Sequence, residues 1–300
     1  MKTEHGMKAS DEMRFGFLME NRTDKAGLTA EHGLSIYIEA CGKKMLFDAG
    51  ATELMVRNAE RMGVDLAAVD LAVVSHGHYD HTGGFPAFCR LNSRAPVYVH
   101  RNAFRESYEL KEGQLCGPDD GIRWTDEERE AMKDRLILTD GPLWVSEDIC
   151  VTGTVQSEEG FEPTEVFYYR DEDGKITADD MSHEQCLVLR QPEGLYVFSG
   201  CSHTGVIGAL NTAKELFPGE KGAVLAAGMH LYKASDTERS RVVEAVAAEA
   251  PERVIPVHCT GMDAICYLKD RRRDRCGTAG AGEWFGRYGE RCEKGGRCEW

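Results

Sequence analysis

Short apolar runs bounded by glycine or polar residues recur along the whole chain and predict buried β-strands. The first three runs follow one another with only short connections, which favours an antiparallel arrangement over a Rossmann unit. Asp173-Gly174 predicts a hairpin turn. We predict strands at residues 14–20, 34–39, 45–50, 69–74, 96–100, 142–155, 165–169, 185–190, 194–198, 223–227 and 253–257.

Helices are predicted between many of these strands, so the chain reads as an α/β protein. One helix begins at Thr125, a good N-cap residue that is followed by acidic residues. The sequence turns polar after residue 102, and we interpret the region around residues 102–182 as a lid or insertion within a single domain spanning residues 1–300. The other predicted helices cover residues 52–62, 83–91, 206–216 and 237–249.

A histidine follows the end of four predicted buried strands. The strongest case is His76-Gly77-His78-Tyr79-Asp80-His81, which comes directly after an apolar run and is followed shortly by Gly83-Gly84. Three imidazoles and a carboxylate so close together favour a metal over an apolar core. His76 and His78 can clamp one metal from a single loop, whereas Asp80 and His81 can face a second one. The later strand-end histidines are His203, His230 and His258.

Composition narrows the classes of partner. The net charge of −15 argues against tight binding to nucleic acid, which requires a basic surface. Residues 1–10 lack the apolar centre of a secretory signal, and no window reaches the length of a membrane span. The 11 cysteines are scattered without a Cys-x-x-Cys pair, which is typical of reduced thiols. We therefore expect a cytoplasmic protein with a small-molecule substrate and neither nucleic-acid nor membrane partners.

Several motifs together resemble the metallo-β-lactamase superfamily. They are the run Leu46-Phe47-Asp48-Ala49-Gly50, the segment from His76 to His81, and His258. More narrowly, the chain resembles the dihydropterin-ribofuranosylaminobenzene-phosphate-synthase-like branch. That resemblance rests on Glu31-His32-Gly33-Leu34-Ser35, Gly200-Cys201-Ser202-His203, Gly228-Met229-His230-Leu231 and His258-Cys259-Thr260-Gly261. It implies a four-layer αββα sandwich with a dinuclear metal site.

The resemblance also implies a ligand set, with one departure. His76 and His78 would bind the first metal, and Asp80, His81 and His258 the second. The superfamily usually adds another histidine and a bridging aspartate. Here His203 is the expected ligand, and Cys201 takes roughly the place of the bridging aspartate, either as a thiolate ligand or as a small buried thiol. His183-Glu184 lies near the usual place of the missing histidine, but an exposed loop explains it equally well.

The remaining roles are expectations of the same kind. Asp80 would orient a metal-held hydroxide, and His230 would contact substrate or act as a general acid. Asp48 either caps the helix after it or braces the metal loop. The ligands suit two divalent metal ions, zinc first, with iron or manganese as alternatives. Asn21, Glu31 and His32 would line the pocket, with a loop-bracing hydrogen bond as the other reading of His32.

We therefore expect a metal-dependent hydrolase or transferase that acts on a small phosphorylated or heteroaromatic, pterin-like substrate. One alternative is a non-catalytic, metal-dependent sensor that binds a small ligand in the same pocket. A diiron redox protein is another alternative, although such proteins normally carry a flavin domain for which this chain is too short.

Overall fold

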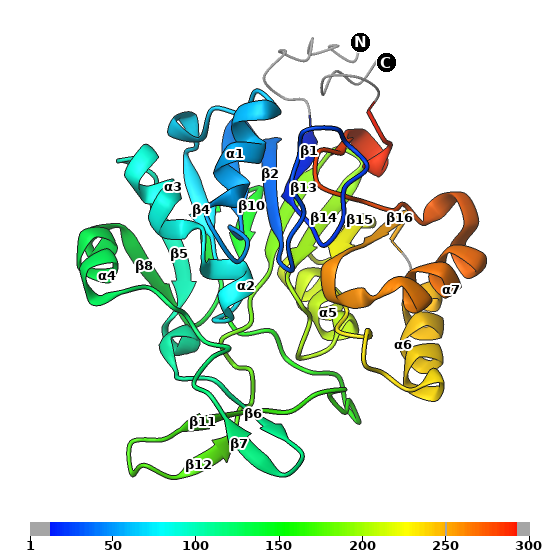
Figure 1. The fold of residues 1–300 in the computed structure, drawn as a ribbon. Helices are drawn as coiled ribbons and strands as arrows, with labels where there is room; N and C mark the ends of the chain where they lie inside the picture. The colour runs from blue at the N-terminus through cyan, green and yellow to red at the C-terminus, as the bar shows by residue number, and fades with distance from the viewer. Residues whose placement is uncertain (1–12, 250, 293–300) are drawn as a thin grey trace.

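Two mixed β-sheets form the centre of the protein (Figure 1), whose computed structural model describes residues 13–249 and 251–292. The first sheet has seven strands in the order β17-β1-β2-β3-β4-β5-β8. Strands β1, β2 and β3 pair antiparallel as predicted, and β3, β4, β5 and β8 run parallel. Its strands are β1 (Arg14–Met19), β2 (Ser35–Ala40), β3 (Lys43–Phe47), β4 (Leu71–Val73), β5 (Val97–His100), β8 (Leu136–Thr139) and β17 (Trp284–Phe285).

The second sheet has six strands in the order β16-β15-β14-β13-β10-β9. Strands β14, β15 and β16 run parallel, so their C-terminal ends meet at one edge of the sheet. The strands are β9 (Leu143–Ser146), β10 (Ile149–Val151), β13 (Leu187–Gln191), β14 (Gly194–Ser199), β15 (Gly222–Ala227) and β16 (Arg253–Pro256).

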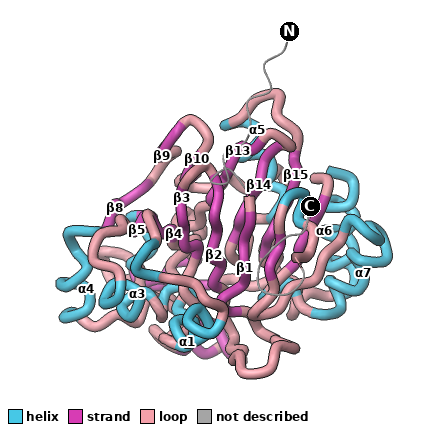
Figure 2. The backbone as a smooth tube through the Cα atoms, turned by 90° about the horizontal axis from the view of Figure 1, so that it is seen from above, coloured by secondary structure: helices cyan, strands magenta, loops and turns pink. Residues whose placement is uncertain are grey.

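Helices cover the outer face of each sheet, as the view along the sheets shows (Figure 2). Helices α1 (Leu54–Arg61), α3 (Phe85–Leu91) and α4 (Asp126–Met132) lie against the first sheet, and α5 (Val206–Leu216), α6 (Asp236–Glu249) and α7 (Met262–Arg272) against the second. The short helix α2 (Tyr79–Thr82) lies within the histidine motif. Single 3₁₀ turns cover Leu66–Ala68, Arg101–Phe104, Lys133–Arg135, His258–Thr260, Arg273–Arg275 and Arg287–Gly289.

The alternation of side chains along the strands creates three cores. Met45 and Phe47 of β3 face the second sheet, whereas Leu46 between them faces the helices. Successive side chains point to opposite faces of a strand, so a strand that is apolar throughout serves both layers. One core lies between the sheets and one beneath each helical layer. The predicted αββα sandwich is therefore present.

A third, smaller sheet projects from the sandwich (Figure 1, bottom). Its order is β12-β11-β6-β7, with β6 (Tyr108–Lys111), β7 (Gln114–Cys116), β11 (Phe167–Arg170) and β12 (Ile176–Ala178). All four strands belong to the region expected to form a lid or insertion. The predicted hairpin turn at Asp173-Gly174 joins β11 to β12, and the predicted Thr125 cap closes a capping box with Glu128.

The polar stretch after residue 102 contains strands that the sequence pattern did not predict. Strands β6 and β7 carry mostly exposed side chains and form by pairing with each other and with β11. Strand β8 was also missed, and it is the parallel edge strand beside β5. No helix among the described residues is long and apolar enough to cross a membrane.

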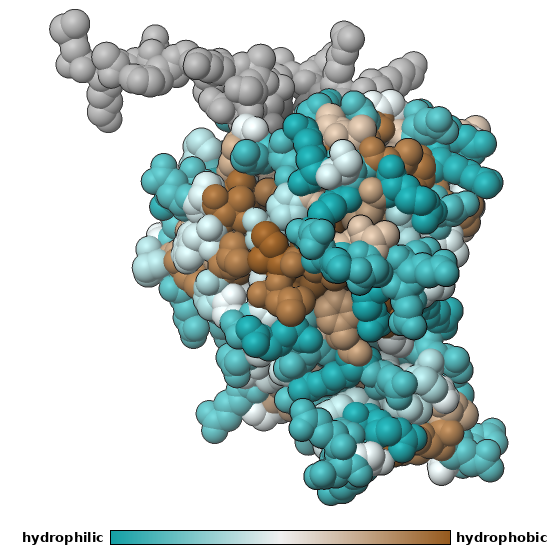
Figure 3. All heavy atoms as spheres, turned by 90° about the vertical axis from the view of Figure 1, so that its left-hand side faces the viewer, coloured by the Kyte–Doolittle hydropathy of each residue, from teal (hydrophilic) through white to brown (hydrophobic). Residues whose placement is uncertain are grey.

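The edge strands β8 and β9 lie on the same side of the molecule and leave apolar side chains exposed. Leu138 is 53% exposed and Trp144 is 45% exposed. Figure 3 shows apolar side chains gathered in the middle of this face.

Candidate metal centre

A cavity of about 110 Å³ lies where strands from both sheets end. The histidine motif reaches it after β4, and three further loops reach it after β14, β15 and β16. The small sheet and its connections contribute side chains from the opposite side. The cavity is lined by His32, His78, Tyr79, Asp80, Glu109, Asp120, Phe167, Cys201, His203, His230, Tyr232, His258 and Cys259.

Close backbone packing explains the glycines of the histidine motif. A Cβ atom at Gly83 would lie 1.9 Å from the carbonyl oxygen of Ala51, and one at Gly84 would lie 2.1 Å from that of Ala49. Both oxygens belong to the loop that follows β3, and backbone hydrogen bonds from Ala49 to His81 and from Gly83 to Gly50 tie this loop to the motif. The motif therefore docks directly on this loop, and only glycine fits at the contact.

Asp48 braces the motif from the end of β3. Its carboxylate accepts hydrogen bonds from the backbone N–H and the hydroxyl of Ser75, both at 2.7 Å, and its Oδ2 lies 2.6 Å from Nδ1 of His81. Burial opposes a charge on His81, but Asp48 and Asp80 outweigh it and raise the pKa of His81 to about 9. At the start of helix α1 the hydroxyl of Thr52 accepts a hydrogen bond from the backbone N–H of Leu54, whereas the Asp48 carboxylate is bonded to Ser75 and His81. Of the two roles predicted for Asp48, the structure shows the brace.

His76, His78 and His203 form a buried imidazole cluster. Nε2 of His76 lies 3.1 Å from Nδ1 of His78, and the His203 ring lies within 5.0 Å of both rings, centroid to centroid. Burial lowers the pKa of His78 to about 3, and burial with the neighbouring imidazoles holds the pKa values of His76 and His203 well below the ordinary value. All three are therefore neutral, which is the form that binds metals.

Asp80 and His258 form the other half of the site together with His32. Oδ2 of Asp80 lies 3.2 Å from Nε2 of His258 and 3.2 Å from Nε2 of His32. Burial opposes ionisation of Asp80, but His81, His258 and His32 outweigh it and hold its pKa well below the ordinary value. The side-chain oxygen of Asn21 lies 2.7 Å from Nδ1 of His258, which leaves Nε2 to face the cavity.

His230 is held from the side of the insertion. Its Nε2 lies 2.9 Å from Oε2 of Glu165, which precedes β11, and Lys233 donates a hydrogen bond to Oε1 of the same carboxylate at 2.6 Å. Burial opposes a charge on His230, but Cys259 and Glu165 outweigh it and raise its pKa to about 9. Phe167 of β11 packs on His78 with a centroid distance of 4.5 Å.

Cys201 lies among the candidate metal ligands, and His203 lies close to it. Its sulfur lies 3.2 Å from Nε2 of His81. It can share a metal with His76 and His203, or with His81 and His258, because in each group the ligand atoms lie within 4.8 Å of one another. The two residues that the sequence left as alternatives therefore both face the site.

Other sequence candidates have positioning roles. His183 and Glu184 are buried, so the exposed loop considered for them is wrong. His183 accepts a hydrogen bond from the backbone N–H of Gly77, and Glu184 accepts bonds from the backbone N–H groups of His203 and Thr204.

Of the three residues predicted to line the pocket, only His32 does so. Glu31 accepts hydrogen bonds from the backbone N–H groups of Ala51 and Thr52 and is not among the residues that line the cavity. Asn21 is likewise outside the lining and holds His258 and His32. His32 is exposed and lines the cavity mouth, where it also contacts Asp80.

The buried imidazoles leave unsatisfied nitrogen atoms, which is the observation that fits a metal. Nε2 of His78, His203 and His258 and Nδ1 of His230 are buried and make no hydrogen bond of normal geometry among the described residues, although Nε2 of His258 lies 3.2 Å from Oδ2 of Asp80. A buried polar atom without a partner costs about 1–3 kcal/mol. Four such atoms around one cavity, beside a carboxylate and a thiol, match the donor types that bind zinc.

Left-handed backbone conformations bring several of these side chains to the cavity. Asp48, Ser202, His230 and His258 have φ values of 58°, 54°, 46° and 51°. Non-glycine residues rarely adopt this conformation, which costs about 1–2 kcal/mol per residue. In the three loops that follow β14, β15 and β16, the chain therefore turns sharply within three residues of the strand end.

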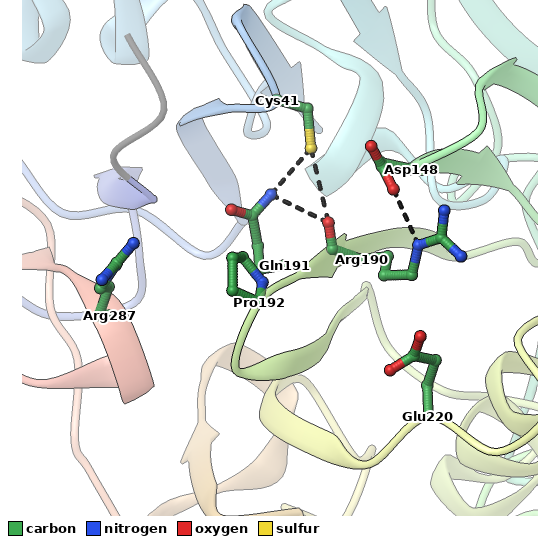
Figure 4. Close-up of a pocket in the computed structure, with 7 residues that line it drawn as sticks. All are labelled: Cys41, Asp148, Arg190, Gln191, Pro192, Glu220 and Arg287. Carbon is green, nitrogen blue, oxygen red and sulfur yellow. Dashed lines mark hydrogen bonds and ion pairs between the residues drawn. The ribbon is translucent and has the colours of Figure 1, made fainter. Parts of the chain in front are cut away.

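A larger cleft of about 450 Å³ lies at the other end of the strands (Figure 4). Cys41 in the β2–β3 turn and Arg190 near the end of β13 contribute to its lining. Some of its polar groups pair with one another, as in the 2.8 Å contact between Arg190 and Asp148. Each group of His, Cys and Asp side chains that could hold a metal in the described chain includes residues that line the smaller cavity.

Comparison with known proteins agrees with this geometry. The family model of the Metallo-beta-lactamase superfamily matches residues 28–227. The 7,8-dihydropterin-6-methyl-4-(beta-D-ribofuranosyl)-aminobenzene-5'-phosphate synthase of Methanocaldococcus jannaschii is 28% identical over 246 residues, which is 78% of this chain and 83% of that protein. An uncharacterized protein of the same organism is 31% identical over 242 residues, or 80% of this chain and 88% of that protein.

A solved structure gives the same picture. The crystal structure of Tm1679, described as a metal-dependent hydrolase of the beta-lactamase superfamily, is 28% identical with a TM-score of 0.76. The match covers 91% of this chain and 98% of that chain. These similarities confirm the predicted fold and the predicted resemblance.

Sequence reasoning missed the residues that hold the ligands from a distance. Glu20 accepts a hydrogen bond from the backbone N–H of His258, although 238 positions separate them. Glu165 and Phe167 come from the insertion, where no metal-binding pattern marks them. Cys259 alone carried a usable signal, because it repeats the placement of Cys201 shortly after a buried strand.

Proposed function

This chain belongs to the metallo-β-lactamase superfamily, and from that premise we propose that it is a metal-dependent hydrolase or transferase with a dinuclear metal site. The buried imidazole nitrogens of His78, His203 and His258, which make no hydrogen bond of normal geometry and face one cavity, carry this proposal. In it, His76, His78 and His203 hold the first metal and Asp80, His81 and His258 hold the second. Zinc suits these donors best, and iron or manganese are the alternatives.

The neighbouring side chains orient the proposed ligands. The Asp48 carboxylate fixes the ring of His81, Asn21 fixes that of His258, and Glu184 fixes the backbone of His203. Such partners determine which ring nitrogen is free to bind. When bound, the two metals would supply an activated water and polarise a carbonyl or phosphoryl oxygen of the substrate.

Two residues are proposed to act on the reacting groups. Asp80 is held between His258 and His32, so its ionised carboxylate can orient a nucleophile. His230 faces the cavity from the opposite loop and is the candidate for a substrate contact or for proton donation. Glu165, on its other ring nitrogen, favours the charged form of His230.

The cavity lining supports a small heteroaromatic substrate. Tyr232 is 42% exposed, and its ring lies 6.5 Å from that of His32 and 5.3 Å from that of His230, centroid to centroid. Aromatic rings of this kind stack on planar ligands. Glu109 and Asp120 line the same cavity and can accept hydrogen bonds from ring N–H or amino groups. A pterin-like compound combines both features, and the synthase relative is named for one.

The test is metal analysis combined with an activity panel. The purified protein is measured for bound zinc, iron and manganese and is then assayed for phosphodiesterase, lactonase and pterin-condensation activity, before and after chelation. We expect activity that chelation abolishes and one metal restores. A metal-free protein that no added metal activates would overturn the proposal. Tight ligand binding without turnover would instead support the sensor.

A further inference from the structure

Two cysteines and a histidine meet on the inner wall of the cavity. Cys201 follows β14, His230 follows β15 and Cys259 follows β16, and these three strands are neighbours that run parallel. Each side chain therefore reaches the same edge of the second sheet. One ligand atom from each residue lies within 4.8 Å of the other two, and all three residues are buried and line the cavity.

The ring of His230 is oriented as a metal ligand would be. Its Nε2 lies 2.9 Å from the Glu165 carboxylate, whereas its Nδ1 is buried without a hydrogen-bond partner. Histidines that bind metals typically place one nitrogen on a carboxylate and leave the other for the ion. Lys233, bound to the other oxygen of Glu165, holds this carboxylate in place.

The local backbone leaves room for the Cys259 sulfur and contacts it. A Cβ atom at Gly228 would lie only 2.7 Å from this sulfur, so glycine is required there. The backbone N–H of His230 donates a hydrogen bond to the same sulfur at 3.2 Å. An amide that points at sulfur in this way favours a thiolate, which is the form of cysteine that binds metals.

We propose that Cys201, His230 and Cys259 form a Cys₂His zinc position. It goes beyond the proposed dinuclear centre, whose six proposed ligands include none of these three residues. Two sulfurs and one imidazole are donors that zinc prefers, and three protein ligands leave a fourth position open to the cavity. Zinc–sulfur bonds of about 2.3 Å place tetrahedral ligand atoms about 3.5–3.8 Å apart, so atoms that lie within 4.8 Å of one another need to approach by at most about 1.3 Å.

This assignment gives His230 a different task from proton donation. With Nε2 on Glu165 and Nδ1 on zinc, His230 is a ligand and has no proton to donate to a substrate. Cys259 likewise becomes a ligand instead of a buried thiol. The two proposed roles of His230 predict different effects of its substitution. A ligand role predicts loss of bound metal, whereas proton donation predicts loss of turnover alone.

Cobalt substitution of the full-length protein tests the proposal. The metal-free protein is titrated with Co²⁺, and the thiolate-to-cobalt charge-transfer band is recorded in the near ultraviolet. We expect a band that is strongly reduced in Cys259→Ser and in His230→Gln and unchanged in Cys276→Ser, a buried thiol outside the cavity. A band that needs Cys201 alone, or a His230→Gln variant that loses turnover and keeps the band, overturns the proposal.

Two further measurements keep the outcomes separate. X-ray absorption of the unmodified zinc protein should show zinc bound to two sulfurs, and zinc with nitrogen and oxygen neighbours only overturns the proposal even if Cys259→Ser fails to fold. Asp80 does not belong to this ligand group. If Asp80→Ala changes neither metal content nor activity while the Cys259-dependent band persists, the dinuclear proposal fails and the Cys₂His position stands.

Discussion

The carboxylate of Asp48 lies 2.6 Å from Nδ1 of His81, and both side chains are fully buried. The contact keeps the Nδ1 proton of His81 on the side of Asp48, so Nε2 faces the sulfur of Cys201. Asp48, at the end of β3, therefore determines the orientation of the His81 ring, which belongs to the motif after β4. The same carboxylate also holds Ser75 at the start of the histidine motif.

Replacing Asp48 by asparagine should reverse this orientation. An amide N–H placed toward Nδ1 requires that nitrogen to accept, so the proton moves to Nε2 and blocks it as a ligand. We expect the Asp48→Asn variant to bind metal about 10- to 100-fold more weakly, measured by calorimetric titration. Asp70→Asn is the control, because Asp70 also accepts a backbone N–H, that of Lys44, at the far end of the sheet. Equal affinities in both variants would contradict the assigned role.

Removing the Asp80 carboxylate should affect the metal more than the fold. Asp80 contacts His32 and His258 through one oxygen, and its side chain is not part of any core. We expect Asp80→Ala to lose metal from the second position and activity by about 100-fold or more, with an unchanged circular dichroism spectrum. Asp119→Ala, at an exposed position outside the histidine motif, should change neither. An unfolded Asp80→Ala protein would show that the motif is structural instead.

Glu184 and Glu31 make matching hydrogen bonds, so variants of the two residues distinguish an effect on metal binding from an effect on loop stability. Each carboxylate accepts two backbone N–H groups and one threonine hydroxyl, of Thr204 for Glu184 and of Thr52 for Glu31. Changing either residue to glutamine sets an N–H against a donor and should cost about 1–3 kcal/mol of unfolding free energy.

Only the change at Glu184 should also lower metal affinity, because that residue holds the loop of His203. Chemical denaturation measures the first effect, and metal analysis after dialysis against a weak chelator measures the second. A loss of metal affinity in Glu31→Gln as large as that in Glu184→Gln would refute this division of roles.

Asp120 should make the metal-free protein less stable as the pH rises. Burial, followed by repulsion from Glu109, raises the pKa of Asp120 from 3.8 to about 6. The folded protein therefore keeps a proton that the unfolded chain releases, and the free energy of unfolding falls between about pH 4 and pH 6. Asp120→Asn removes this effect and should raise the Tm at pH 7.5 by about 1–3 °C, an amount reduced by the partial exposure of the group.

Scanning calorimetry at pH 4 and pH 7.5 checks this expectation. At pH 4 the Tm values of the variant and the unchanged protein should converge, because Asp120 is then protonated in the folded state. The exposed Asp119→Asn variant should show no difference at either pH. A lower Tm for Asp120→Asn at pH 7.5 would contradict the raised pKa.

The elements with apolar residues on both faces were predictable from sequence, and the elements that depend on a partner were not. Strand β3 is apolar throughout its second half because both faces are buried, so its pattern is local. Strand β7 has no such pattern, since its side chains are mostly exposed and its order comes from pairing with β6. Edge strand β8 was missed for a related reason, because only one of its four residues is fully buried.

The candidate ligands could be predicted for a similar reason, whereas their supports could not. His76, His78 and His81 share one loop, so their spacing alone brings them together. Asn21 and His258 meet only because the fold joins positions 237 residues apart. Nothing near Glu165 indicates that its carboxylate reaches His230, 65 residues further on. A single sequence contains the donors, and the tertiary structure decides which carboxylate orients each of them.

The left-handed residues around the cavity also make metal supply part of the folding equilibrium. Asp48, Ser202, His230 and His258 hold unfavourable backbone conformations, and three of the unpaired buried nitrogens lie on His203, His230 and His258, within or beside these turns. A metal that satisfies these nitrogens binds the folded chain and not the unfolded one. By mass action it stabilises the fold by about 2.7 kcal/mol at a free concentration 100 times its dissociation constant. In a cell poor in that metal, less of the protein would therefore be folded, and its abundance would follow the metal supply.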